Sequence, residues 1–270
     1  MSILIPILAV TVIGMICAVM LVVASKFMAV PEDEKFAAVR ACLPGANCGA
    51  CGYAGCDGYA HALADGEITK TNLCVPGGAD AAANVAAAMG LEAGDVVRQV
   101  AYVACCGDSE CVSPRHEYVG IKSCSAAQLL YAGDSRCTYS CLGYGDCAAV
   151  CPNNAIEVRN TLARINPVLC VGCGLCAKTC PNHVIHIVPE NIRTFVRCSN
   201  HDKGAVTRSA CKIGCIGCKK CERECPAGAI TVVNNLAVID YDKCTHCGHC
   251  KEICTTGCIT EASFAAARKS

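Results

Sequence analysis

The chain has no tryptophan, only 4% aromatic residues and no net charge, since 23 lysines and arginines balance 23 aspartates and glutamates over 270 residues. A neutral chain offers no net electrostatic attraction for nucleic acid, so we expect no such partner. The sequence also lacks a Gly-x-Gly-x-x-Gly turn after a strand, a P-loop and a persuasive pair of nucleophile and base. We therefore expect no catalytic residues for organic chemistry.

Cysteine, in contrast, is abundant, with 29 copies. A disulfide scaffold is disfavoured because the number is odd and such scaffolds are usually small secreted domains. Cys170, Cys173, Cys176 and Cys180-Pro181 have the spacing of a bacterial ferredoxin run. A structural zinc site would instead use two separate Cys-x2-Cys pairs. The spacing therefore predicts iron–sulfur clusters.

A repeat organises the second half of the chain. Residues 151–170 and 225–244 are identical at ten of twenty positions without a gap, at an offset of 74 residues. Each copy predicts a short hairpin, with strands at 155–158 and 162–165 in the first copy and at 230–233 and 236–239 in the second. So small a core cannot fold alone, so we expect cluster binding to supply folding free energy.

In a two-cluster ferredoxin, the cysteine that precedes proline binds the other cluster. Applied to both copies, this rule predicts four ligand sets. They are Cys137, Cys141, Cys147 and Cys180; Cys151, Cys170, Cys173 and Cys176; Cys215, Cys218, Cys221 and Cys254; and Cys225, Cys244, Cys247 and Cys250. The first set departs from the usual spacing, and Gly143 and Gly145 are expected to let its longer loops bend tightly. Thr255 replaces the proline after Cys254, which is expected to leave ligation intact.

A different motif precedes the repeats. Its spacing is Cys48-x2-Cys51-x4-Cys56-x17-Cys74, with interspersed glycines that permit close backbone approach. We predict a fifth four-cysteine iron–sulfur site here, with structural zinc as the alternative. An alanine-rich segment, residues 79–93, predicts a helix that leads onward.

The remaining cysteines divide into two groups. Cys17, Cys42 and Cys258 are interpreted as apolar filler, a spare thiol and a core residue. Six others precede the ferredoxin-like segments, and Cys106 is the weakest candidate because adjacent cysteines rarely face one cubane. A sixth cluster would draw on Cys105, Cys111, Cys124, Cys198 and Cys211. Several free thiols are the alternative, so the sequence predicts five [4Fe–4S] clusters and leaves a sixth open.

An uncharged segment near the start predicts a membrane anchor. Residues 3–24 could cross a hydrocarbon core of about 30 Å as a helix. Only two residues precede the segment, so a cleaved signal peptide is disfavoured. Lys26, Lys35 and Arg40 follow it, which predicts a single-pass protein with its bulk in the cytoplasm and lipid around residues 3–24.

These motifs together resemble a known family. The segment Leu-Pro-Gly-Ala-Asn-Cys-Gly-Ala-Cys-Gly at 43–52, the segment 120–156 and the paired ferredoxin runs resemble the B subunit of the Rnf complex, in its long multi-cluster form. The resemblance covers essentially the whole chain. It implies a subunit of a membrane-bound ferredoxin:NAD⁺ oxidoreductase that couples electron flow to Na⁺ or H⁺ export in a bacterial or archaeal cytoplasmic membrane. The implied partners are reduced ferredoxin and the other membrane and flavin subunits.

The sequence thus predicts an α+β protein in four parts. These are a transmembrane anchor (1–26), a near-membrane [4Fe–4S] domain (27–94), and two ferredoxin-like two-cluster modules (95–190 and 191–270). Clusters of this kind carry the one-electron chemistry themselves, and the protein sets their spacing, exposure and hydrogen bonds. Two alternatives are an iron–sulfur subunit of a hydrogenase or formate dehydrogenase, and a zinc-binding scaffold without electron transfer.

Charge suggests where electrons enter. Residues 191–270 hold 12 Lys/Arg against 7 Asp/Glu, whereas residues 1–190 hold 11 against 16. Since ferredoxins are usually acidic, we predict that reduced ferredoxin docks at Lys219, Lys220 and Arg223 in the last module. An ordinary solvated face is the alternative interpretation.

Overall fold

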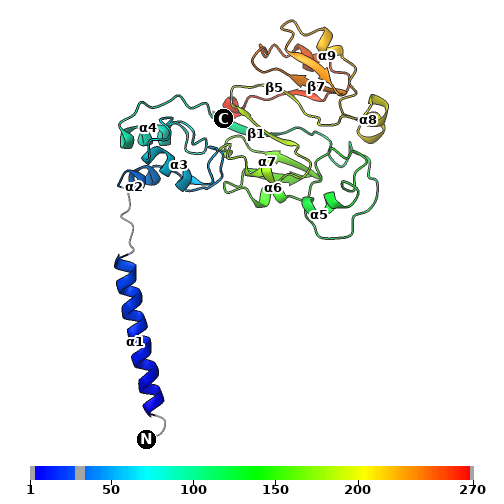
Figure 1. The fold of residues 1–270 in the computed structure, drawn as a ribbon. Helices are drawn as coiled ribbons and strands as arrows, with labels where there is room; N and C mark the ends of the chain where they lie inside the picture. Colours follow the sequence, from blue (N-terminus) through cyan, green and yellow to red (C-terminus); the bar gives the residue numbers. More distant parts are fainter. Residues whose placement is uncertain (1–3, 28–33, 268–270) are drawn as a thin grey trace.

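The computed structural model of the chain describes residues 4–27 and 34–267. Helix α1 (Leu4–Phe27) stands apart from the rest of the molecule (Figure 1). A small helical domain follows, with α2 (Glu34–Ala41), α3 (Cys56–Ala64) and α4 (Gly78–Met89). Beyond it lie four two-stranded antiparallel sheets with short helices between their strands.

Helix α1 corrects one prediction. Within the described ranges, no helix is both long and apolar enough to cross a membrane. This finding contradicts the transmembrane helix predicted over residues 3–24, so the predicted lipid contact and single-pass topology are left without support.

The helical domain packs around a few fully buried side chains. Val39 of α2, Tyr59 and Leu63 of α3, and Val85 of α4 are each 1% exposed or less. The alanine-rich helix predicted over residues 79–93 is present as α4. It ends at Gly90, which adopts a left-handed conformation with φ of 65° and so stops the helix. Arg40 of α2 forms an ion pair with Asp57 of α3.

Each ferredoxin-like module consists of one hairpin and one pair of distant strands. In the first module, β2 (Ile156–Arg159) pairs with β3 (Leu162–Ile165), and β1 (Gln99–Val103) pairs with β4 (Ile185–Pro189). In the second, β6 (Ile230–Val233) pairs with β7 (Leu236–Ile239), and β5 (Thr194–Val196) pairs with β8 (Ile259–Glu261). Both predicted hairpins are confirmed. The closing strands β4 and β8 make each module a unit that surrounds its cysteine loops.

Short helices lie between and beside these strands, and some of them carry a cysteine. In the first module they are α5 (Cys124–Leu129), α6 (Asp146–Ala149) and α7 (Leu175–Thr179). In the second they are α8 (Gly204–Ala210), α9 (Lys220–Arg223), α10 (His249–Glu252) and α11 (Phe264–Ala267). Helix α5 belongs to a long segment between β1 and β2 that forms one end of the molecule (Figure 1).

Two tight turns hold the cysteine loops against the hairpins. The hairpin turns Asn160-Thr161 and Asn234-Asn235 have positive φ at both residues, as a type I′ turn requires. Gly143 and Gly217 occupy equivalent positions of the repeat and also have positive φ. A Cβ at Gly143 would lie 2.4 Å from the backbone oxygen of Thr161, and one at Gly217 would lie 2.8 Å from that of Asn235. Only glycine allows this close approach.

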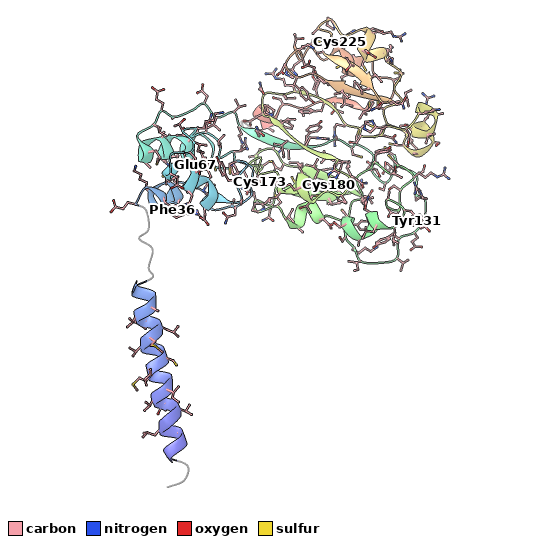
Figure 2. The ribbon with its side chains drawn as sticks, viewed as in Figure 1. Phe36, Glu67, Tyr131, Cys173, Cys180 and Cys225 are labelled. Carbon is pink, nitrogen blue, oxygen red and sulfur yellow. The ribbon has the colours of Figure 1, made fainter. Side chains whose placement is uncertain are left out.

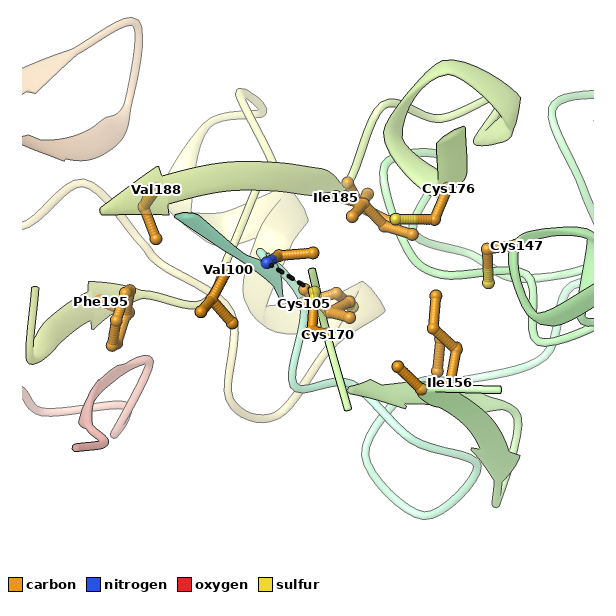
Figure 3. Packing of buried hydrophobic residues seen from close by; sticks show 14 of the residues in the cluster. Val100, Cys105, Cys147, Ile156, Cys170, Cys176, Ile185, Val188 and Phe195 are labelled. Carbon is orange, nitrogen blue, oxygen red and sulfur yellow. Dashed lines mark hydrogen bonds between the residues drawn. The ribbon is translucent and has the colours of Figure 1, made fainter. Parts of the chain in front are cut away.

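Aliphatic and sulfur atoms fill the core of the first module together. Val100, Ile156 and Ile185 lie among Cys147, Cys170 and Cys176 (Figure 3). The amide of Ala101 donates a hydrogen bond to the Sγ atom of Cys170 over 3.4 Å. The buried ring of Phe195 in β5 extends this core toward the second module, with its centroid 4.8 Å from Tyr102 and 5.1 Å from Phe264. Phe195 therefore joins the two modules.

We expect Phe195→Ala to destabilise the protein by about 3–5 kcal/mol, because it removes a ring that is 2% exposed and leaves a cavity between the modules. Thermal unfolding of the cluster-loaded protein, followed anaerobically by circular dichroism, would show a lower Tm. Val119→Ala is the matched control, since Val119 is 87% exposed and should change the stability by less than about 0.5 kcal/mol. Equal Tm values for the two variants would contradict this role for Phe195.

Candidate iron–sulfur sites

Three of the predicted four-cysteine sets each line one small cavity. The Cys48 site consists of Cys48, Cys51, Cys56 and Cys74; the Cys151 site of Cys151, Cys170, Cys173 and Cys176; and the Cys225 site of Cys225, Cys244, Cys247 and Cys250. Among the described residues, no group of three or more Cys, His, Asp or Glu is arranged to hold a single metal ion. The thiols of each set instead surround an apolar hollow.

The surroundings of these thiols suit a cluster. Burial, followed by the neighbouring thiols Cys170 and Cys173, raises the pKa of Cys176 to about 12, and burial raises that of Cys250 to about 11. Such thiols stay protonated at neutral pH unless metal ions bind the thiolate. The amides of Ala155 and Ala229, at equivalent positions of the repeat, donate to Cys151 Sγ and Cys225 Sγ over 3.3 and 3.4 Å. These hydrogen bonds fit sulfur atoms that carry negative charge.

The predicted set of Cys137, Cys141, Cys147 and Cys180 has a further thiol, Cys124, beside two of its members. Burial, followed by the thiols of Cys141, Cys124 and Cys180, raises the pKa of Cys147 to about 12. Burial also raises the pKa of Cys141, again with contributions from Cys124 and Cys180. The structure thus brings Cys124, Cys141, Cys147 and Cys180 together, and we name this group the Cys141 site. It places Cys137 in a different cavity.

The repeat offers a reason why Cys124 lies beside Cys141 and Cys147. At the offset of 74 residues, Cys141, Cys147 and Cys151 correspond to Cys215, Cys221 and Cys225, whereas Tyr144 stands where the second copy has Cys218. The first module therefore lacks one cysteine of its run, and Cys124 from the long segment after β1 lies beside the other three. Extending the repeat upstream of Cys151 would have revealed this gap from the sequence.

Asp146 holds Cys124 in place by binding the N-terminus of α5. The amides of Cys124 and Ser125 both donate to its carboxylate over 3.0 Å, and the Ser123 hydroxyl donates over 2.9 Å. Burial opposes ionisation of this carboxyl, but the hydrogen bonds from Ser125, Cys124 and Ser123 lower its pKa overall. Asp146 precedes Cys147 directly, so one short segment fixes two members of the Cys141 site.

A further cavity lies at the junction of the two modules. It is lined by Cys105, Cys106, Cys137, Cys198 and Cys211, and we name it the junction site. Cys137 and Cys211 are equivalents in the repeat, so each module contributes its copy. The pKa of Cys137 is raised by burial, and the buried side chain of Asn200 donates to its Sγ atom over 3.3 Å. Cys198 Sγ accepts the amide of Cys215 over 3.2 Å.

The neighbours of each thiol distinguish Cys106 from Cys105. Burial raises the pKa of Cys106 to about 12, with Cys198 and Cys211 among the thiols that add to the shift. The pKa of Cys105 is also raised to about 12 by burial, but its thiol neighbours are Cys141 and Cys106. Cys111 lies near Cys211, and the Asp108 carboxylate contributes to the raised pKa of this thiol after burial. Both thiols line the junction site, and Cys106 is the one whose raised pKa includes contributions from Cys198 and Cys211.

The remaining predicted set lies in the second module, and we name it the Cys215 site. Its members, Cys215, Cys218, Cys221 and Cys254, lie close to one another. Burial, followed by Cys215, Cys218 and Cys254, raises the pKa of Cys221 to about 11. The thiol of Cys258 also lies in this group, 3.7 Å from Cys254 Sγ. Hydrogen bonding from Cys258 lowers the pKa of Cys254 to about 4 and that of Cys215 to about 6.

The helical domain meets the first module beside two cysteine sites. The ammonium group of Lys178 donates to the backbone oxygen of Cys48 over 2.9 Å. The pKa of Cys173 is raised by burial, and Cys48 is the first thiol that contributes to the shift. Figure 2 shows Cys173 on the side of the module that faces the helical domain, where Glu67 and Phe36 are labelled. The Cys48 and Cys151 sites are therefore neighbours.

The predicted docking residues lie beside the Cys215 site. Lys219 precedes α9 in a left-handed conformation, and Lys220 and Arg223 are the ends of that helix. Lys219 and Arg223 are exposed, as are two thiols of this module, Cys218 and Cys247. Among the candidate sites of the described residues, those of the second module have the thiols that are most exposed to solvent.

Comparison with known protein families defines the class of this protein. Residues 43–76 match a sequence model described as a putative Fe-S cluster, residues 163–186 match a 4Fe-4S binding domain, and residues 214–258 match a 4Fe-4S dicluster domain. The fold and these matches define an iron–sulfur protein. The match at 43–76 covers the four cysteines of the Cys48 site.

Full-length relatives place the chain more narrowly. It is 43% identical to the B subunit of the Na⁺-translocating ferredoxin:NAD⁺ oxidoreductase complex of Acetobacterium woodii over 96% of this chain and 78% of the relative. It is 44% identical to the B subunit of the proton-translocating complex of Clostridium ljungdahlii over 92% and 89%. It is 39% identical to the B subunit of the ion-translocating oxidoreductase complex of Methanosarcina acetivorans over 90% and 92%.

The chain belongs to the family of B subunits of ion-translocating ferredoxin:NAD⁺ oxidoreductase complexes. It is an iron–sulfur electron-transfer subunit of such a complex, as its sequence predicts, and the other subunits are its partners. Ion translocation requires a membrane, so the complex is membrane-associated. The family relationship also favours this function over the hydrogenase-type and zinc-scaffold alternatives.

We expect Asp146→Ala to lower the stability by about 1–2 kcal/mol at pH 7, because it leaves the N-terminal amides of α5 without an acceptor. Thermal unfolding measures the loss, and Ser125→Ala, which keeps the bonds to Ser123 and Cys124, should cost less. Since the folded pKa of Asp146 is lowered, its contribution is present above the unfolded value of about 3.9 and is lost as the pH falls through the folded value. An unchanged Tm at pH 7 would contradict the capping role.

Proposed function

We propose that the chain holds six [4Fe–4S] clusters. Their ligands would be the four cysteines of each of the Cys48, Cys151, Cys225, Cys141 and Cys215 sites, and Cys106, Cys137, Cys198 and Cys211 at the junction site. Cys124 then replaces Cys137 in the first module, and Cys137 serves the sixth cluster. Cys105, Cys111 and Cys258 are left without a primary role as ligands.

The observation that carries this proposal is the continuity of the sites. Lys178 and Cys173 join the Cys48 and Cys151 sites, and Cys176 lies near Cys147 of the Cys141 site. Cys105, which lines the junction site, also lies near Cys141, and the amide of Cys215 donates to Cys198 Sγ. Cys221 and Cys225 share one buried core in the second module. Bound clusters would carry single electrons, and the protein's residues fix their spacing and surround their sulfur atoms.

We infer a direction from exposure and charge. Cys218 and Cys247 are exposed, and basic residues are concentrated in residues 191–270. Reduced ferredoxin would deliver electrons at this end, beside Lys219, Lys220 and Arg223. The electrons would then pass through the junction and the first module to the Cys48 site, from which the partner subunits receive them.

Iron analysis of double variants tests the ligand assignment. The intact protein should contain roughly 24 irons, and Cys124→Ala or Cys137→Ala should each lose about four. Because Cys124 and Cys141 share a site, Cys124→Ala/Cys141→Ala should lose no more than either single variant. Cys124→Ala/Cys137→Ala affects two sites and should lose about eight.

The controls are Cys42→Ala and Cys105→Ala, which should keep all the iron and the same electron paramagnetic resonance spectrum after dithionite reduction. If Cys137→Ala/Cys141→Ala loses only about four irons, Cys137 and Cys141 share one site, and the proposed exchange of Cys124 for Cys137 is wrong. Loss of iron in Cys105→Ala would instead assign the junction ligand to Cys105.

We expect the triple variant Lys219→Glu/Lys220→Glu/Arg223→Glu to be reduced by ferredoxin at least about tenfold more slowly at low salt, because charge steering is reversed. The difference should shrink above about 0.5 M salt, where screening is strong. Stopped-flow absorbance measures the rate. The matched control reverses three exposed cations outside the second module, Lys70, Lys122 and Arg159, and should change the rate far less. Equal rates for the two triple variants would reject docking at this end.

A further inference from the structure

Cys258 is a fifth thiol within the Cys215 site. It is 1% exposed, its Sγ atom lies 3.7 Å from that of Cys254, and it shares one buried core with Cys215. Two different members of the proposed ligand set therefore lie in its surroundings. Sulfur atoms this close leave no room for another side chain between Cys258 and the site.

The internal repeat shows that packing does not require a thiol here. Cys258 follows Cys254 by four residues, and the equivalent position after Cys180 is Val184. The corresponding residues after Cys151 and Cys225 are Ala155 and Ala229. All four side chains are buried, with exposures of 1% to 3%. An aliphatic residue fills this position three times, so the sulfur of Cys258 is a chemical difference rather than a packing requirement.

The loop that carries Cys254 is also less restricted than its counterparts. Pro152, Pro181 and Pro226 follow the equivalent cysteines and restrict the backbone, whereas Thr255 follows Cys254. Gly257, immediately before Cys258, adopts a positive φ of 71° as its repeat equivalent Gly228 does at 59°, so the missing proline is what distinguishes the Cys254 loop from the Cys225 loop. A change between staggered χ1 rotamers moves a cysteine Sγ atom by roughly 3 Å. That displacement is comparable to the separation of the two sulfur atoms.

We propose that Cys258 is a reserve ligand of the Cys215 site, which binds the iron that Cys254 binds when the Cys254 thiolate is absent. In this exchange one iron–sulfur bond to Cys254 is replaced by one to Cys258. The Cys258 thiol releases its proton to solvent, and no electron is transferred. The inference rests on the proposed ligand set of the Cys215 site, and the first module provides a matched site without a reserve thiol.

The test compares Cys254→Ala with Cys180→Ala, the equivalent change in the first module. Iron content and the paramagnetic resonance spectra of the oxidised and dithionite-reduced proteins are measured after anaerobic purification. We expect Cys254→Ala to keep all its iron, and Cys180→Ala to lose up to about four irons or to show a three-iron cluster when oxidised. Cys258→Val alone, which copies the first module, should keep all the iron and so report on folding.

Two double variants complete the test. Cys254→Ala/Cys258→Val should lose the cluster that Cys254→Ala retains, and Cys180→Ala/Val184→Cys should recover what Cys180→Ala loses. If Cys254→Ala behaves as Cys180→Ala does, or if Cys254→Ala/Cys258→Val keeps its iron, Cys258 is not a reserve ligand. Cys221→Ala separates the two proposals, because retention of all iron in that variant would reject the ligand set itself.

Discussion

The bond between cysteine sulfur and iron is the interaction on which the rest of this structure depends. The cores of both modules contain several cysteines among a few short aliphatic side chains, and each of their described strands has only three to five residues. Such cores bury too little apolar surface to offset the conformational entropy of so many loops. Burial raises the pKa of many of these thiols, so an empty site would hold protonated sulfur atoms around a hollow. We therefore expect the binding of clusters and folding to be coupled.

The repeat explains how one chain brings several sites close together. Both modules use a hairpin with a left-handed turn, and a glycine of the cysteine loop packs against each turn. Where the first module has Tyr144 in place of a cysteine, Cys124 approaches from a segment that the second module lacks. Cys137 and its repeat equivalent Cys211 line the same cavity at the junction. A departure from the repeat thus accompanies the cavity that connects the two modules.

Local features could be predicted well because they depend on residues close in sequence. The hairpins at 156–165 and 230–239 follow from alternating β-branched residues around asparagine-containing turns, and α4 follows from its alanines and Gly90. The partners of Cys124 and Cys137 could not be read from spacing, since each lies in a long irregular segment. The transmembrane helix predicted from the uncharged run at residues 3–24 is contradicted, because no helix among the described residues is long and apolar enough to cross a membrane.

By itself, the sequence determined the chemistry: cysteines at ferredoxin spacing, a second kind of motif at 48–74, and a tandem repeat that identified the family. Only the tertiary structure decided how the cysteines group, because cluster ligands need to converge within a few ångströms while their positions along the chain differ by up to about a hundred residues. It placed Cys124 beside Cys141, Cys198 beside Cys215, and Cys48 beside Cys173. These three proximities bring cysteines of separate sequence motifs close together in space.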